Sequence, residues 1–250
     1  MERKNAIELA IKSAIHLQLH SDTICTACQY LHRFYYYIDT IVKEDCSDAT
    51  NQLRNCDTGI VVTTCLYIAS KTNENHVRLS ELISSVYHHV KAKQANMTVI
   101  NYDNYQLLTK EEKNYWKLRD SVVEFEFYLL RVLQFNLTID LPHKYLIFYL
   151  KSLSDWIHNN TLIEELFLLS WSLLNDYYCH HPESGKCKPN QCALACIQLA
   201  IKIISPKIRP LIENKQTNKC WYTNFDNSLK SDQIEIIIDQ VLSITSTEHE

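Results

Sequence analysis

Glycine is almost absent from this chain of 250 residues: it occurs only at Gly59 and Gly185. A loop that cradles phosphate groups needs several glycines close together, because backbone N–H groups must approach the anion. Neither the dinucleotide-binding fingerprint nor the nucleotide P-loop can be written with two distant glycines. The sequence therefore excludes both of these ways of binding a nucleotide.

Proline is also rare, with five residues in the whole chain. An all-β protein needs many turn residues of both kinds between its short strands. Hydrophobic residues make up 46% of the sequence, so the chain is globular rather than disordered. Long periodic stretches with so few breaking residues predict an all-α protein, of one large or two ordinary domains.

The sequence has no excess of positive charge. Its 25 Lys and Arg residues against 29 Asp and Glu give a formal charge of −4. A protein that follows nucleic-acid phosphates is usually basic, so this balance disfavours nucleic-acid binding. Glu8 and Lys12 interrupt the first helix where a signal peptide would have an apolar core, and no lipidation motif is present. We expect a nuclear or cytoplasmic protein that binds no membrane.

Cysteine, by contrast, is abundant, with ten residues. Most lie on apolar helical faces, which is typical of small core residues in a reducing compartment. The CxxC pair Cys25 and Cys28 lacks the second ligand pair or βαβ context that zinc or redox use requires. A later loop holds zinc-ligand residue types whose spacing fits no common zinc module, so we predict neither metal nor cofactor. That loop contains Cys179, His180, His181 and Cys187.

The stretch from Trp116 to Leu137 contains neither Gly nor Pro and is rich in large apolar residues. Large apolar groups lie on nearly every side of the helix that it would form. A helix apolar almost all round is packed by neighbours on several faces, so we predict that this is the central helix of a bundle. Its charged residues exclude a membrane span. These are Lys117, Arg119, Asp120, Glu124, Glu126 and Arg131.

Apolar periodicity and caps predict the other helices. Ser21-Asp22 is a good N-cap, and the capping-box pattern at Thr109 should open the helix that contains Trp116. Residues 91–109 are polar and aperiodic, which indicates an insertion, and a short helix is expected near Trp221 and Phe225. The remaining helices are expected at 2–19, 22–42, 59–71, 80–90, 141–153, 161–179, 189–204 and 231–244.

A weak internal repeat links the two halves of the chain. The segment CLYIASK, Cys65–Lys71, aligns with CIQLAIK, Cys196–Lys202. Each lies in the third predicted helix of its half. Pro142 suits the first turn of a new helix, so we place the domain junction there. The sequence thus predicts two tandem five-helix domains, at 1–138 and 139–250.

Three segments carry a resemblance to a known family. They are YLHRF at Tyr30–Phe34, LYIASK at Leu66–Lys71 followed by Glu74, and LRVLQFNL at Leu130–Leu137. Together they resemble the cyclin box, and the likeness covers almost the whole chain, with a cyclin-like box in each half. The phrases YWKLRDSV and LPHKYL, at 115–122 and 141–146, resemble a short transcription-type branch of the family, which implies cyclin-dependent kinase 10 as partner.

The resemblance implies a regulatory subunit with no catalysis of its own. Cyclins bind the small lobe of a kinase and favour its active arrangement, which is a shift in population. In the family, a lysine that ends the third helix and a glutamate on the fifth contact the segment beside the kinase C helix. The matching residues are Lys71 and Glu126. Apolar anchors of the kinase-binding face map to Ile68, Leu130, Phe135 and Leu137.

The residues themselves partly support this assignment. Glu126 lies between Phe125 and Phe127, and a buried carboxylate needs a cationic partner, for which Lys71 is a candidate. Alternatively, Glu126 lies on the polar stripe and is solvated. Lys71 could also simply complement the helix dipole, because Lys202 occupies the same place in the other repeat.

The sequence departs from the family pattern at three places. Asn73 stands where the family usually has a carboxylate after the lysine. The first helix begins ERKNA, which is polar where many cell-cycle cyclins carry an apolar docking patch, so substrate docking there is not expected. A family ion pair between the first two helices would fall on Arg3 and His32, which removes the carboxylate that this bond uses.

Three other functions remain open. A general transcription factor built from the same repeats would clamp DNA, but this requires a basic face that the acidic sequence does not provide. An adaptor of the same fold would bind another protein without activating a kinase. An enzyme would need histidines in a catalytic spacing, and none are found. The histidines considered are His16, His20, His88, His89, His143 and His158.

Overall fold

The computed structural model describes residues 2–44, 56–95, 113–157, 159–182, 187–204, 220–226 and 231–246. Every regular element within these ranges is helical, which confirms the all-α prediction. The chain divides into two compact units, Met1–Ile139 and Asp140–Glu250. None of the described helices is both long and apolar enough to cross a bilayer.

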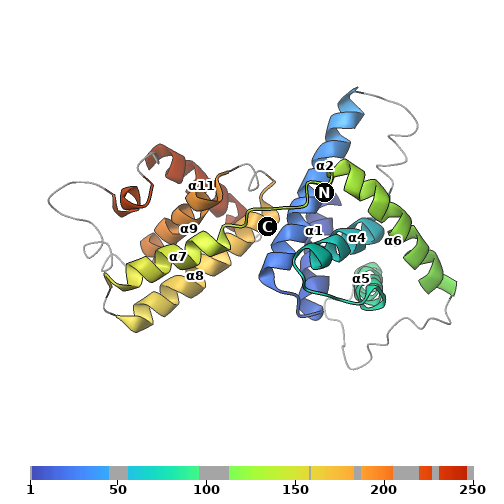
Figure 1. Cartoon of the computed structure of the whole chain (residues 1–250), viewed down its shortest axis with the longest axis horizontal. Helices are drawn as coiled ribbons and strands as arrows, with labels where there is room; N and C mark the ends of the chain where they lie inside the picture. The colour runs from blue at the N-terminus through green and yellow to red at the C-terminus, as the bar shows by residue number, and fades with distance from the viewer. Residues whose placement is uncertain are drawn as a thin grey trace. The chain divides into compact units, whose positions relative to one another are not determined.

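The first unit is a bundle around one buried helix, α4 (Figure 1). Helix α4 packs against all the other described helices of the unit. Asp57 begins it, because the Asp57 side chain accepts a hydrogen bond of 2.8 Å from the Gly59 N–H. The helices are α1 (Glu2–His16), α2 (Ser21–Glu44), α4 (Thr58–Thr72), α5 (Leu79–Gln94) and α6 (Lys113–Val132).

The prediction that Trp116–Leu137 is the central helix is wrong. Helix α6 packs against α4, α5 and, more sparsely, α2, so it has one buried face. That face is a narrow stripe of Tyr115, Val122 and Leu129, whereas the Phe127 side chain is 66% exposed. An apolar sequence shows what a helix is able to bury, but the neighbours that arrive decide what it does bury.

Helix α6 also ends earlier than the apolar pattern suggests, at Val132. The backbone then turns, because Gln134 and Phe135 adopt φ angles of 53° and 55°. The Phe135 N–H donates to the Leu130 carbonyl at 2.9 Å, which closes the helix end. Neither residue is a glycine, so the sequence carries no ordinary sign of this turn.

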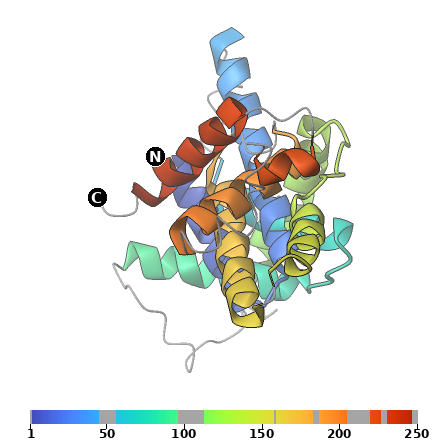
Figure 2. The ribbon, with the colours of Figure 1, turned by 90° about the vertical axis from the view of Figure 1, so that its left-hand side faces the viewer.

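The second unit is built in the same way around α9, which packs against α7, α8 and α11. Figures 1 and 2, at right angles to each other, both show α8 and α9 side by side. All ten residues from Cys192 to Ile201 are buried. The elements are α7 (His143–Ser154), α8 (Asn160–His180), α9 (Pro189–Ile204), the 3-10 helix η3 (Trp221–Asn224) and α11 (Ser231–Ser246).

The repeat found in the sequence coincides with the two buried helices. Cys65 of α4 and Cys196 of α9 are both completely buried. Helix α5 extends to Gln94 and so includes the first residues of the predicted insertion at 91–109. Residues 96–109 of that insertion and the capping box at Thr109 lie outside the described residues.

Candidate functional site

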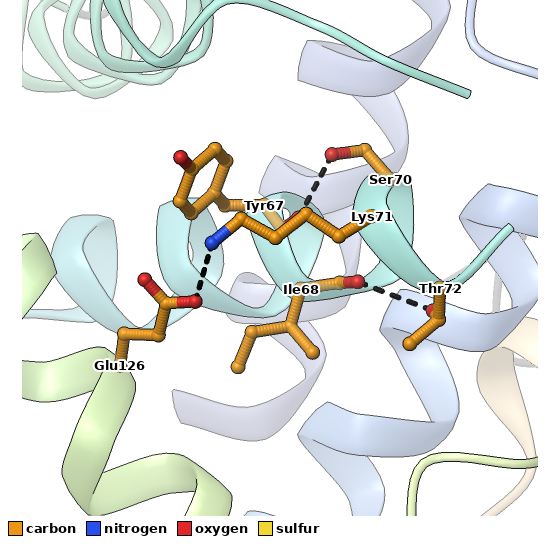
Figure 3. Close-up of polar contacts among 6 residues, drawn as sticks. All are labelled: Tyr67, Ile68, Ser70, Lys71, Thr72 and Glu126. Carbon is orange, nitrogen blue, oxygen red and sulfur yellow. Dashed lines mark hydrogen bonds and ion pairs between the residues drawn. The ribbon is translucent and has the colours of Figure 1, made fainter. Parts of the chain in front are cut away.

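An ion pair joins helix α4 to helix α6. Lys71 lies in the last turn of α4 and Glu126 lies on α6. The Lys71 Nζ donates to Glu126 Oε1 at 2.6 Å (Figure 3). The Lys71 side chain is 46% exposed and that of Glu126 is 18% exposed. The structure therefore pairs the two residues, and Glu126 is not the freely solvated carboxylate of the alternative interpretation.

An aromatic ring lies on a second side of the Lys71 ammonium group. Its Nζ is 3.8 Å from the centroid of the Tyr67 ring, a distance typical of a cation–π contact. The two residues are four apart on α4 and therefore share one helix face. Figure 3 shows the lysine side chain extending back over the ring, with Glu126 approaching from the neighbouring helix.

Asn73 replaces a family carboxylate and ties the end of α4 to α2. As the C-cap of α4, it donates its backbone N–H to the Ala69 carbonyl at 3.0 Å. Its side-chain Nδ2 donates to Thr26 Oγ1, also at 3.0 Å. The departure from the family pattern thus has a structural role, because it fixes the turn that directly follows Lys71.

The predicted apolar anchors differ in how much of each side chain a partner could reach. Ile68 is only 2% exposed and belongs to the core, so it supports the surface from beneath. Leu130 and Leu137 are half-buried. Phe135 is 68% exposed and projects from the left-handed turn after α6. Their kinase-binding role stays a prediction.

The segment that carries Leu137 is held to the rest of the unit by α2. The Tyr30 hydroxyl donates to the Leu137 carbonyl at 2.7 Å and lies 3.3 Å from Thr72 Oγ1. Arg33 donates to the Asn136 carbonyl at 2.9 Å. The YLHRF segment of the cyclin-like pattern therefore fixes the backbone on which Phe135 and Leu137 are displayed.

Two residues of this surface were not named from the sequence as site residues. Tyr67 precedes Lys71 by one helical turn, a spacing that could have indicated the contact. The sequence places Phe127 beside Glu126 and suggests that both Phe125 and Phe127 surround the carboxylate with apolar groups. In the structure Phe125 points inward, and its ring centroid lies 5.6 Å from that of Phe34. Phe127 instead faces solvent.

The structure keeps a bond between the first two helices at the positions where the family ion pair would fall. Arg3 Nε donates to His32 Nδ1 at 3.0 Å, and His32 is buried. Burial lowers the pKa of Arg3 from its ordinary value, while Asp39 and Tyr35 oppose this effect. A neutral histidine nitrogen is a sufficient acceptor, so the connection persists as a hydrogen bond without a carboxylate.

Two residues of the predicted cysteine and histidine loop, His181 and Cys187, contact Tyr177. Its hydroxyl lies 3.5 Å from Cys187 Sγ and donates to Gln240 Oε1 at 2.9 Å. The His181 ring stacks on the Tyr177 ring, with centroids 5.3 Å apart. Within the described part of the chain, no three His, Cys, Asp or Glu side chains converge as metal ligands.

Six of the cysteines that the structure describes are buried and belong to the core. None of the nine cysteines in the described ranges forms a disulfide. Burial raises the pKa of Cys196 to about 12 and also raises the pKa of Cys65. A buried thiol with a raised pKa is neutral, whereas metal binding and nucleophilic attack require the thiolate.

The histidines near Ser85 do not form a catalytic arrangement. His16 Nδ1 lies 3.0 Å from Ser85 Oγ, and His89 Nδ1 donates to the Ser85 carbonyl at 2.8 Å. Ser85 is completely buried and its Oγ donates to the Ser13 carbonyl at 3.3 Å. A nucleophile needs access to substrate, so these contacts join α1 to α5 structurally.

Comparison with known proteins agrees with the geometry of the first unit. The family model of the cyclin N-terminal domain matches residues 1–138. Cyclin-K of Danio rerio is 23% identical over 244 residues, which are 98% of this chain and 49% of the relative. This chain thus spans about half the length of that relative, and 36% of the length of Cyclin-K of Homo sapiens.

Solved structures share the fold. One chain in the structure of the CAK complex from Chaetomium thermophilum bound to ATP-gamma-S has a TM-score of 0.61 and 14% identity, over 97% of this chain and 62% of that chain. A chain in the yeast RNA Pol II CTD kinase CTDK-1 complex has a TM-score of 0.53 and 15% identity, over 98% and 75%. Because the domain model covers more than half of the sequence, this chain belongs to the cyclin family.

Proposed function

We propose that this chain is the regulatory subunit of a cyclin-dependent Ser/Thr kinase, with the catalysis supplied by the kinase. The observation that carries the proposal is the Lys71–Glu126 ion pair at 2.6 Å, at the two positions that the resemblance assigns to kinase binding. It is supported by membership of the cyclin family and by fold similarity to a chain of a CTD kinase complex. The pair lies within the matched domain.

The site offers both polar and apolar contacts to a kinase. The Lys71 ammonium has three N–H donors and uses one on Glu126, and Glu126 keeps a second carboxylate oxygen. A partner backbone could accept from Lys71 and donate to Glu126. Phe127 and Phe135 are exposed aromatic side chains on the same helix and the turn that follows it, the type of residue that anchors interfaces.

Binding would activate the kinase by a shift in population. A cyclin that binds only the arrangement with the C helix inward favours that arrangement by its differential affinity for it. The C helix then brings its glutamate to the catalytic lysine of the kinase. The residues of this chain take no part in phosphoryl transfer.

The identity of the kinase is a finer part of the proposal. The phrases YWKLRDSV and LPHKYL resemble cyclin Q, also called cyclin M, which favours cyclin-dependent kinase 10 as the partner. Its relatives of the transcription type, such as Cyclin-K, favour a nuclear location. We also assign residues 139–250 as a second, cyclin-like box, with α9 as the counterpart of α4.

The test removes both charges at the site with side chains of similar length. We expect the double variant Lys71→Met, Glu126→Gln to lower binding and activation of purified cyclin-dependent kinase 10 several-fold or more, because polar pairs at an interface centre are often hot spots. Lys202→Met is the matched control, because Lys202 occupies the equivalent position on α9. It should activate like the unmodified chain.

The outcomes separate the alternatives. Activation unchanged in the double variant would reject the site. A chain that binds the kinase without raising its activity would favour the adaptor function. A chain that binds and activates a different cyclin-dependent kinase would retain the general function and reject cyclin-dependent kinase 10.

A further inference from the structure

We propose that Tyr67 is a positioning residue that holds the Lys71 ammonium group against Glu126, ready for the kinase. This inference rests on the proposed function, because it concerns how the same site is prepared for its partner. Tyr67 lies one turn before Lys71 on α4, is half-buried, and faces the lysine with its ring. Tyr67 lies within the LYIASK segment that carries the family resemblance, but the resemblance assigns the kinase contact to Lys71 and Glu126 and gives Tyr67 no role.

The geometry confines the ammonium group on two sides. The ring centroid of Tyr67 lies 3.8 Å from Lys71 Nζ, and Glu126 Oε1 lies 2.6 Å from the same atom. A lysine otherwise carries its charge on a flexible four-carbon stem with many rotamers. The aromatic face and the carboxylate together select the arrangements in which Nζ lies between them.

This position of Nζ differs from that expected of a lysine that only complements the helix dipole. Such a lysine would extend toward the unpaired carbonyls at the end of α4. Lys71 instead extends backward over Tyr67, as helical side chains do when they cover the preceding turn (Figure 3). The Lys71 charge is therefore directed at the surface shared with α6.

The second unit provides an internal comparison. Lys202 occupies the position of Lys71 on α9, and the residue four places before it is Gln198. The Gln198 side chain is buried and accepts a hydrogen bond from Trp221 Nε1. Lys202 therefore has no aromatic residue four places before it. The Tyr67 ring is a feature of the Lys71 site and not of the helix architecture that both units share.

The two contacts give the Lys71 ammonium group a fixed direction in which it can donate to a partner. One N–H of Lys71 is used on Glu126, and the aromatic ring covers another side of the ammonium group. The remaining donor capacity points away from both. Restricting the free side chain in this way lowers the entropy lost when a partner binds, which is the general advantage of preorganisation.

The experiment compares Tyr67→Leu with Tyr67→Phe in the full chain. The first variant removes the aromatic ring but keeps an apolar side chain, and the second keeps the ring and removes the hydroxyl. NMR of ¹³C-labelled lysine would record the Lys71 ε-methylene protons, assigned with Lys71→Arg. We expect an upfield ring-current shift in the unmodified chain and Tyr67→Phe, lost in Tyr67→Leu.

Binding to cyclin-dependent kinase 10 gives the second measurement. A cation–π contact at an exposed site corresponds to a loss of roughly two- to fivefold in affinity for Tyr67→Leu, with Tyr67→Phe restoring it. A Lys71 shift unchanged in Tyr67→Leu would overturn the positioning role, whether or not a kinase binds. If Tyr67→Leu loses the Lys71 ring-current shift but binds the kinase with unchanged affinity, the proposed role of Tyr67 in kinase binding is overturned.

If the unmodified chain binds no kinase, the proposed function fails, and the NMR comparison still decides whether Tyr67 holds Lys71. Helix content and melting temperature of both variants, measured by circular dichroism, should match those of the unmodified chain. A variant of Tyr67 that unfolds is replaced in the test by Tyr67→Met, which is flexible, apolar and lacks a ring.

Discussion

Gln134 holds a left-handed backbone conformation, with φ at 53°, directly before the exposed Phe135. In this region the β-carbon of an L-residue crowds the following carbonyl, at a cost of about 1–2 kcal/mol. Glycine avoids that crowding, although it loses more backbone entropy on folding, about 0.5–1 kcal/mol. Strain at this position is therefore a local property that one substitution can remove.

We predict that Gln134→Gly raises the free energy of unfolding by about 0.5–1 kcal/mol. The Gln134 side chain is exposed, so little packing is lost. Chemical denaturation followed by circular dichroism measures the change. Gln134→Ala is the control and should give no gain, because alanine has the same β-carbon. Equal stabilisation by both substitutions would contradict the account based on φ.

At the scale of the element, α4 and α6 differ in how much of their apolar residues they bury. Leu66 on α4 is completely buried, whereas Phe127 on α6 is largely exposed. Large-to-small substitution in a core removes buried area and leaves a cavity. Truncation of an exposed side chain removes little buried area and leaves no cavity.

We expect Leu66→Ala to lower the free energy of unfolding by about 2–5 kcal/mol. Phe127→Ala should change it by no more than about 0.5 kcal/mol. Denaturation curves of the two variants would measure the difference directly. A larger loss from Phe127→Ala than from Leu66→Ala would mean that α6, and not α4, is the central helix.

The contact between α1 and α5 depends on the charge of two histidines. Burial lowers the pKa of His16, and the nearby His89 and His88 add to the effect. Burial also lowers the pKa of His89, as do Lys12 and His88, while the hydrogen bond to Ser85 opposes the shift. Both rings are therefore favoured in their neutral form in the folded protein.

The direction of the pH dependence follows from these shifts. As pH falls below the ordinary histidine pKa of about 6.5, the unfolded chain takes up protons before the folded one does. Unfolding is then favoured, because the unfolded state binds more protons. The stabilisation is full above about pH 6.5 and is lost as pH falls through the lowered values.

We predict that amide hydrogen exchange in α1 and α5 accelerates between pH 7.5 and 5.5, after correction for the intrinsic rates. The double variant His16→Gln, His89→Gln should show a smaller change, because neither site titrates. His76→Gln is the control, since His76 is exposed. The same pH response in the double variant as in the unmodified chain would contradict the assignment to these two rings.

At the scale of the whole molecule, each compact unit contains its own buried helix. Helix α4 packs within Met1–Ile139 and α9 packs within Asp140–Glu250. Units of this size with a separate core are able to fold alone. The chain therefore has the organisation of two folding units rather than of one divided core.

We predict that fragments 1–139 and 140–250 each fold as helical proteins when produced separately. Each should unfold in one cooperative transition, as small single domains usually do. Circular dichroism during heating measures both properties. A fragment with little helix, or a gradual transition without a midpoint, would show that its core needs the other unit. Ellipticity of the two fragments should also add up to that of the full chain.

The sequence alone could predict much of this protein. Few glycines and prolines and a sustained helical period predicted the all-α fold, because helices need only local hydrogen bonds and an apolar face. The repeat around Cys65 and Cys196 coincided with the two buried helices, since a helix surrounded by neighbours keeps small and apolar residues on every side. The resemblance carried by LYIASK and LRVLQFNL identified the cyclin family, which the domain model confirms.

Only the tertiary structure decided which surfaces are buried. The stretch from Trp116 to Leu137 is apolar all round, yet its neighbours lie on one side, and its helix ends at a turn that no glycine marks. Sequence placed Ile68 and Phe135 in one group of anchors, whereas packing put the first in the core and the second in solvent. The Lys71–Glu126 pair and the Tyr67 ring beside it require two helices and specific rotamers. Periodicity within one helix carries no information about which helix will approach it, because that depends on contacts between residues far apart in the chain.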